Sequence, residues 1–174
     1  MKVIHLGLTG AAWLLATPAA VAQSPPPAPQ AAMRPFDRWI GDWSGSGWST
    51  SATGERTEFT LVETVQRKVG GTVLLLEGRG TTASGTVTHD GLVVLYYDEK
   101  AGGYRWNGHD LGRAPVDAEA KLVDGGLEWS IGAGRGATVR FRIQFDEKRW
   151  HEVGEVSADG KIWNRFMEMI LARQ

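Results

Sequence analysis

The sequence predicts an all-β protein, an antiparallel up-and-down β-barrel of about 8–10 strands with one short N-terminal helical turn. Three observations predict this fold class. Short runs of alternating apolar and polar residues recur through the chain, glycine-rich turn signals separate them, and no long helical pattern interrupts them. Regular hairpin spacing favours a closed meander, with a β-sandwich as the alternative. The lack of intervening helices argues against a parallel sheet.

The first residues have the order of a secretory signal peptide. Lys2 supplies one positive charge, residues 3–15 are almost wholly apolar, and the A-V-A at 20–22 offers the small residues of a cleavage site. The apolar run is shorter than the roughly 20 residues that a membrane-spanning helix needs. We therefore expect a signal peptide at 1–22, cleavage near Ala22, and a periplasmic or secreted protein. A membrane anchor or a buried helix is the alternative.

Proline and alanine dominate the next segment, residues 23–35. Such a composition predicts an extended, disordered linker, with a docking ligand as the alternative. The folded unit is expected to run from 36 to 174, the size of one domain. It should begin with a single helical turn around 35–40, where proline is tolerated at the first position.

Charge and cysteine content exclude several classes of protein. The chain has 19 Lys and Arg against 20 Asp and Glu, a net charge of −1, and no cysteine. No basic excess is present for nucleic acid, so we expect no nucleic-acid partner. Without cysteine there are no disulfides, thiolate metal sites or lipid-anchoring thiols. No second apolar run predicts a membrane anchor, so the mature protein is expected to be soluble, in an oligomeric state that the sequence does not set.

The clearest strand lies at 138–145, where apolar and polar residues alternate. Similar runs, or runs rich in β-branched and aromatic residues, lie at 55–69, 72–76, 92–97, 127–131 and 150–156. Gly-Gly and Asp-Gly pairs, including the one at 90–91, are hairpin-turn signals between them. The last segment, 161–173, fits either a strand or a helix.

The segment 39–47, W-I-G-D-W-S-G-S-G, resembles the opening of a calycin barrel, the superfamily of lipocalins and fatty-acid-binding proteins. Those barrels begin with a helical turn and a G-x-W whose tryptophan plugs the base, matched here by Gly41-Asp42-Trp43. The D-G-K-x-W at 159–163 and the M-E-M at 167–169 are similar to the ending of a bacterial lipocalin-like, exported family of unknown function. The resemblance implies a barrel with a ligand-sized lumen.

No cofactor and no metal are expected. Nitrobindins, a related calycin family, bind haem through a histidine near the C-terminus, but residues 164–174 contain none. A thioether ligand from Met169 is the alternative. His89, His109 and His151 lack the paired spacings that are typical of zinc sites.

Aromatic, methionine and polar side chains on the predicted strands are the candidate ligand-binding residues. These are Trp106, His109, Trp129, Trp163, Arg165, Met167 and Glu168. The aromatic rings and the methionine would line an apolar lumen, and the polar groups would orient a ligand's head. The register of the last strand decides whether Arg165 faces inward with Trp163, Met167 and Met169. The favoured register places Ile162, Phe166 and Ile170 inward and Arg165 in water.

We expect a non-enzymatic protein that binds a small, mainly apolar or amphipathic ligand, and no catalytic residues, because the sequence has no nucleophile motif. Two alternatives stay open. One is a structural or protein-interaction domain with a filled barrel. The other is an enzyme with His109 or His151 as the base beside a carboxylate, which two titratable groups within hydrogen-bond reach in a pocket would favour.

Overall fold

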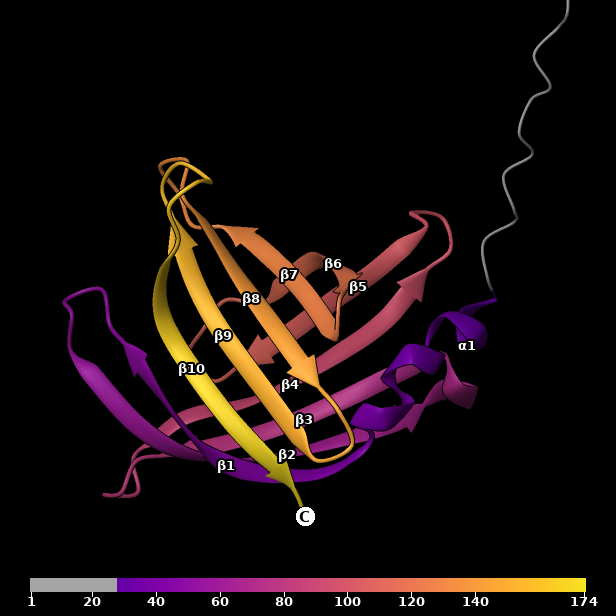
Figure 1. Cartoon of the computed structure of the whole chain (residues 1–174), viewed down its shortest axis with the longest axis horizontal. Coiled ribbons are helices and arrows are strands. Elements are labelled where there is room, and N and C mark those ends of the chain that lie inside the picture. The colour runs from indigo at the N-terminus through magenta and orange to yellow at the C-terminus, as the bar shows by residue number, and fades with distance from the viewer. Residues whose placement is uncertain (1–27) are drawn as a thin grey trace, which may run out of the picture.

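In the computed structural model, which describes residues 28–174, the chain forms a closed antiparallel barrel of ten strands (Figure 1). The strands are β1 (Gly41–Thr50), β2 (Arg56–Lys68), β3 (Val73–Thr81), β4 (Val87–Asp98), β5 (Gly103–Asp110), β6 (Val116–Val123), β7 (Gly126–Gly132), β8 (Thr138–Phe145), β9 (Arg149–Ser157) and β10 (Asn164–Arg173). The helical elements are α1 (Pro29–Ala32), η1 (Arg34–Trp39) and η2 (Val69–Gly71). The predicted fold class is confirmed.

Each strand pairs with the next along the chain, and the pairing of β1 with β10 closes the sheet. Gly45 lies opposite Leu171 in this last ladder. Closure leaves no unpaired sheet edge, so every strand can place one face inward and one face in solvent. Across residues 28–174, none of the helices combines the length and apolar character that crossing a membrane requires.

The folded unit begins earlier than the sequence predicts. Residues 23–35 were expected to be a disordered linker, but Pro29–Ala32 forms α1 and Met33 is fully buried. The Tyr104 hydroxyl donates a 2.8 Å hydrogen bond to the carbonyl of Ala32, which fixes α1 against the barrel. The apolar Ala32 and Met33 side chains cover one end of the core, so the boundary moves to α1. The expected signal peptide at 1–22 lies outside the described residues.

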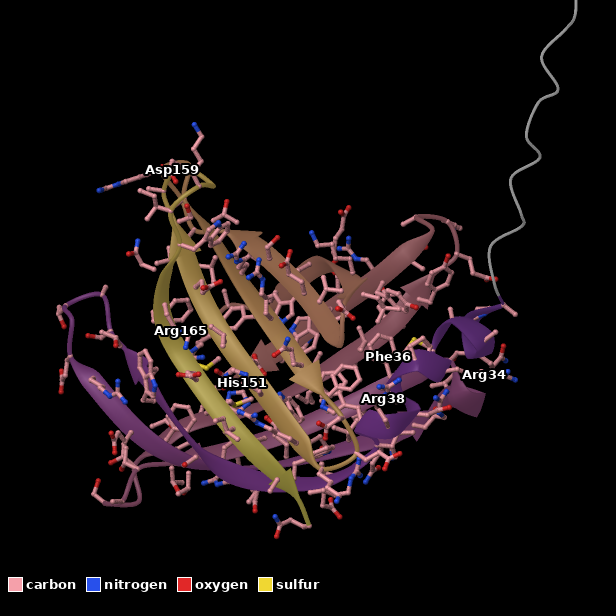
Figure 2. All side chains as sticks on the ribbon, in the orientation of Figure 1. Arg34, Phe36, Arg38, His151, Asp159 and Arg165 are labelled. Atoms are coloured by element: carbon pink, nitrogen blue, oxygen red, sulfur yellow. The ribbon has the colours of Figure 1, made fainter. Side chains whose placement is uncertain are left out.

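A cluster of buried aromatic side chains, which we call the plug, closes this same end of the barrel. Its members are Phe36, Trp39, Trp43, Phe145 and Trp150. Trp39 stacks on Phe145 at 4.7 Å between ring centroids and meets Trp150 edge-on at 4.6 Å. The Trp43 indole N–H donates to the carbonyl of Trp39 at 2.9 Å. Phe36 comes from η1, at the end of the barrel where α1 lies (Figure 2). The tryptophan of the G-x-W therefore plugs the base, as the resemblance implies.

Arg173 fastens the end of the last strand to the plug. Its guanidinium lies over the Trp43 ring at 4.3 Å and donates to the carbonyls of Ile40 and Glu147, each at 2.6 Å. The charge is thus satisfied by backbone oxygens while its flat face covers an aromatic ring.

The hairpin expected at residues 90–91 does not form. Asp90 and Gly91 lie inside β4, and Gly91 pairs with Gly78 of β3. An Asp-Gly pair predicts a turn because glycine tolerates positive φ, but here the missing side chain is what matters. A Cβ on Gly91 would lie 3.2 Å from Cε1 of His89. The expected hairpins at Gly125 and Gly160 are present, with φ of 76° and 72°.

The last segment is the strand β10, and its register differs from the favoured one. A β-bulge lies between Arg165 and Met167, so that Phe166 and Met167 both line the lumen. Beyond the bulge Met169 and Leu171 face inward, while Ile170 is 45 % exposed. Placing Ile170 inward was therefore wrong, because the extra residue exchanges the two faces of the strand.

Trp39→Ala should lower the free energy of unfolding by about 3–5 kcal/mol, because it leaves a large void among stacked rings. Urea unfolding followed by circular dichroism measures this. Trp163→Ala is the matched control: its ring lies under the Arg140 guanidinium at 3.6 Å and is half-buried, so the loss should be about 1 kcal/mol or less. Equal losses in the two variants would contradict the role of the plug.

Candidate functional site

The barrel encloses a cavity of about 360 Å³ between the plug and the loops at the opposite end. Its apolar walls include Leu61, Val93, Trp106, Trp129, Ile131, Val139, Phe141, Phe166, Met167 and Met169. Its polar groups include Glu63, Thr88, His89, Asp110, Arg113 and Glu152. A concave, mostly apolar space with a few polar groups is typical of a small-molecule site.

Three parallel aromatic rings form one wall of the cavity, from β5, β7 and β8. Trp106 and Trp129 stack at 5.1 Å, and Trp129 stacks on Phe141 at 4.3 Å, each pair within 14° of parallel. Trp106 and Trp129 reach each other across β6, where their register partners are Ala118 and Ala120. These small side chains leave the room in which the two indoles stack on each other, so this part of the cavity wall is aromatic and apolar.

A second wall carries charge. On β2, β3, β4 and β5, one row of register partners reads Glu63, Gly78, Gly91 and Asp110. The two central glycines have no side chains, and a Cβ on Gly78 would overlap the Glu63 carboxyl. The space above the glycines is therefore what allows the polar side chains of this wall to lie flat inside the barrel.

His89 lies in that space and connects the two acids. Its Nδ1 is 3.2 Å from Oδ1 of Asp110, and its Nε2 is 3.9 Å from Oε1 of Glu63. Asp110 also pairs with Arg113 at 2.7 Å, and the Arg113 side chain is 67 % exposed. A chain of ionisable groups thus runs from the buried Glu63 to the mouth of the cavity.

Two carboxyl groups are buried in the lumen. Glu63 is 8 % exposed and Glu152 is 7 % exposed. The pKa of Glu63 is raised to about 8, mainly because the carboxyl group is buried and also because the charge of Glu152 lies nearby. Burial also raises the pKa of Glu152 to about 7, against the lowering effect of a 3.2 Å hydrogen bond from the Trp150 indole. Near neutral pH the empty lumen therefore holds these acids partly protonated, a state that carboxyl groups in water do not adopt.

Of the ligand-binding residues that the sequence predicts, Trp106, Trp129 and Met167 lie together in the cavity wall. His109 lies at its rim. The His109 side chain is exposed, and its Nε2 is 3.2 Å from Oδ1 of Asn107.

Trp163, Arg165 and Glu168 are not part of the lumen. Arg165 is half exposed and pairs with Glu168 at 3.1 Å, and His151 pairs with the same carboxylate at 2.8 Å. The hydrogen bond from His151 lowers the pKa of Glu168. Figure 2 shows His151 and Arg165 on β9 and β10. His151, Arg165 and Glu168 form a surface cluster outside the cavity, and the exposed Arg165 agrees with the favoured register, which placed it in water. The bulge in β10 explains the exposure of Arg165, because it changes which residues face inward.

Sequence reasoning missed Glu63, His89, Asp110 and Glu152. A signal for Glu63 was available: it alternates with the apolar Leu61 and Val65 on β2 and so shares their inward face. No comparable signal existed for His89, because a turn was expected beside it at residues 90–91. Across residues 28–174, no group of three His, Asp or Glu side chains has an arrangement that could hold a metal ion.

Glu63→Gln should flatten the dependence of stability on pH. The native carboxyl has a pKa above its unfolded value of 4.5, so its stabilising contribution is complete below about pH 4.5 and is lost as the pH rises to about 8. The variant should therefore be more stable than the wild type at pH 8.5, by about 1–3 kcal/mol. Urea unfolding at pH 5, 7 and 8.5 tests this. Glu119→Gln, at an exposed position of β6, should leave the wild-type profile unchanged.

A comparison with family models finds no match, and a comparison with curated proteins finds none. Solved structures are similar. Rv2717c from M. tuberculosis is 14% identical, with a TM-score of 0.63 over 82% of this chain and 97% of its own. The S-type phycobiliprotein lyase CpeS from Guillardia theta is 12% identical, with a TM-score of 0.57; the match covers 82% of this chain and 92% of the lyase. A protein of unknown function of the DUF3598 family from Nostoc punctiforme is 10% identical, with a TM-score of 0.52; the match covers 80% of this chain and 49% of that protein. The chain shares its barrel fold with these structures.

Proposed function

We propose that this chain is a binding protein that holds one small, mainly apolar ligand inside its barrel. The observation that carries the proposal is the 360 Å³ lumenal cavity with its stacked aromatic wall. Trp106, Trp129 and Met167 would contact the apolar body of the ligand. Sites of this kind bury most of a ligand against apolar side chains and fix its orientation with a few polar groups.

The cavity distinguishes this function from that of an interaction domain with a filled barrel. Packed protein interiors leave few voids larger than a water molecule. A void of this size, lined in part by Gly108, where a larger side chain would fill it, is instead what a ligand site requires. The likeness to a phycobiliprotein lyase is compatible with this proposal, since both chains share a barrel that can enclose a small molecule.

Acid–base catalysis is the second candidate function. The contact of 3.2 Å between His89 and Asp110, inside a cavity, is the type of pair that the enzyme hypothesis needed, although with a different histidine from those expected. Native mass spectrometry of the purified protein would identify a bound compound. If incubation converts that compound and His89→Gln stops the conversion without loss of binding, the protein is an enzyme. Release of the compound unchanged supports a binding protein.

We also propose that the ligand is met outside the cytoplasm, because residues 1–22 have the pattern of a secretory signal. The exported protein should then begin at Gln23, which N-terminal sequencing of the periplasmic or secreted fraction measures. An N-terminus at Met1 in that fraction would contradict cleavage.

Gly108→Leu should block the lumen. A Cβ at Gly108 would lie at ordinary contact distances, 3.4 Å from Nε1 of Trp106 and 3.6 Å from Cγ2 of Val93, so a larger side chain projects into the cavity. The neutral fluorophore N-phenyl-1-naphthylamine should bind the wild type saturably and bind the variant at least about tenfold more weakly, a loss of about 1.4 kcal/mol. A fluorescence titration measures both affinities.

Gly132→Leu is the matched control. Gly132 ends β7 in an exposed position with open space around its Cα, so the same substitution adds no bulk to the lumen. Its affinity for the fluorophore should equal that of the wild type. Equal binding by wild type and Gly108→Leu would place the fluorophore outside the barrel and refute lumenal binding.

A further inference from the structure

We propose that the ligand is an organic amine, with a cationic N–H head between Glu63 and Glu152 and an apolar body against Trp106, Trp129 and Phe141. This inference rests on the proposed lumenal binding function and names the chemical class of its ligand. Three observations lead to it: the sign of the lumenal charge, the lack of hydrogen bonds to Glu63, and the aromatic character of the apolar wall.

The charged groups of the lumen are mostly acidic. Glu63, Asp110 and Glu152 line the cavity, and Arg113 is the single Lys or Arg side chain among the described residues that line it. Arg113 lies at the mouth and is already paired with Asp110 at 2.7 Å. An anionic ligand would therefore face like charges in a poorly solvated space, whereas a cation would find opposite charges.

Glu63 is the group that most clearly lacks a partner. It is more than nine-tenths buried, and in the described part of the chain its carboxyl receives no hydrogen bond; Nε2 of His89 lies 3.9 Å from Oε1, beyond hydrogen-bond distance. A buried carboxyl without hydrogen bonds costs folding free energy, because its lost contacts with water are not replaced. A ligand ammonium would supply the missing donors.

Glu152 completes the acidic environment of the ligand head. It accepts the Trp150 indole hydrogen bond through Oε2, and the negative charge it gains on ionisation acts on Glu63. An ammonium group beside Glu63 would therefore lie near a second carboxyl group.

The apolar wall selects the body of the ligand. The rings of Trp106, Trp129 and Phe141 are nearly parallel over two consecutive contacts of 5.1 and 4.3 Å. Rings stacked in this way cover much of one another's faces and leave the lumen an aromatic, apolar wall against which the apolar part of a ligand can pack. This wall and the two acids together favour an amine with an apolar body.

The proposal predicts that amine binding is coupled to proton release. In the empty lumen burial favours the protonated acids, and an ammonium ion beside them favours the ionised forms. The groups that face Glu63 are His89 on β4 and Glu152 on β9, with Asp110 and Arg113 further toward the mouth. Amine affinity should therefore rise with pH, by roughly tenfold between pH 6 and pH 8.

Three naphthalenes of nearly equal size test the inference by isothermal titration calorimetry: 1-naphthylmethylamine as the cation, 1-naphthylmethanol as the neutral analogue and 1-naphthoic acid as the anion. At pH 8 the amine should bind about tenfold more tightly than the alcohol, and the acid most weakly. Glu63→Gln and Glu152→Gln should each weaken the amine by about tenfold and leave the alcohol unchanged. Glu119→Gln, which removes an exposed carboxyl of β6 outside the lumen, should retain the preference and its pH dependence.

Equal affinities for amine and alcohol, or tighter binding of the acid, would overturn the inference and leave a lumenal binder of another ligand class. If none of the three naphthalenes nor N-phenyl-1-naphthylamine binds, the proposed function itself is overturned. An amine preference that survives in the double variant Glu63→Gln/Glu152→Gln would also overturn the inference, because the cation would then be held elsewhere.

Discussion

The absence of side chains at inward-facing positions is the constraint on which the lumen depends. In a ten-stranded barrel the inward residues of all strands compete for one central space. At the base, the rings of Trp39, Trp43 and Trp150 fill that space completely. Further along, Gly78, Gly91 and Gly108 leave it open. One end of the barrel is therefore a packed core and the other holds the lumenal cavity, and the same sheet forms both.

The packed base stabilises the barrel that contains the cavity. Closure of the sheet between β1 and β10 puts Arg173 over Trp43, so the last strand and the first meet at the base through a cation and an aromatic ring. The stability of this end comes from large buried rings, which are among the strongest contributors to a core. A rigid base offsets the cost of leaving a cavity and two buried carboxyl groups above it. The energetic cost of the site is thus met elsewhere in the fold.

The buried acids give the lumen its chemical character. Glu63 and Glu152 lie in an apolar cavity where ionisation is unfavourable, so their protonation depends on whatever else occupies the space. Groups of this kind cluster at functional sites, since a protein gains nothing in stability from an unpaired buried carboxyl. The stacked wall beside them provides an apolar surface without hydrogen-bonding demands apart from the Trp129 N–H. The two features together describe an amphipathic occupant.

The sequence by itself determined the local features of this protein. The two-residue period of strands identified most of the β-segments, and the same period placed Trp106 and Trp129 on an inward face. The G-x-W and its helical turn predicted the base of the barrel. Local patterns succeed here because strand geometry fixes the alternation of side chains whatever the partner strand is.

The tertiary structure alone decided which residues meet. Glu63, His89, Asp110 and Glu152 are distant in sequence and come together through the register of six neighbouring ladders, which no single strand encodes. The bulge in β10 placed both Arg165 and Glu168 on the surface. Gly91, which was expected in a turn, instead pairs with Gly78 inside the sheet and lines the cavity. Alternation is a property of one strand, whereas convergence depends on how all ten are staggered around the barrel.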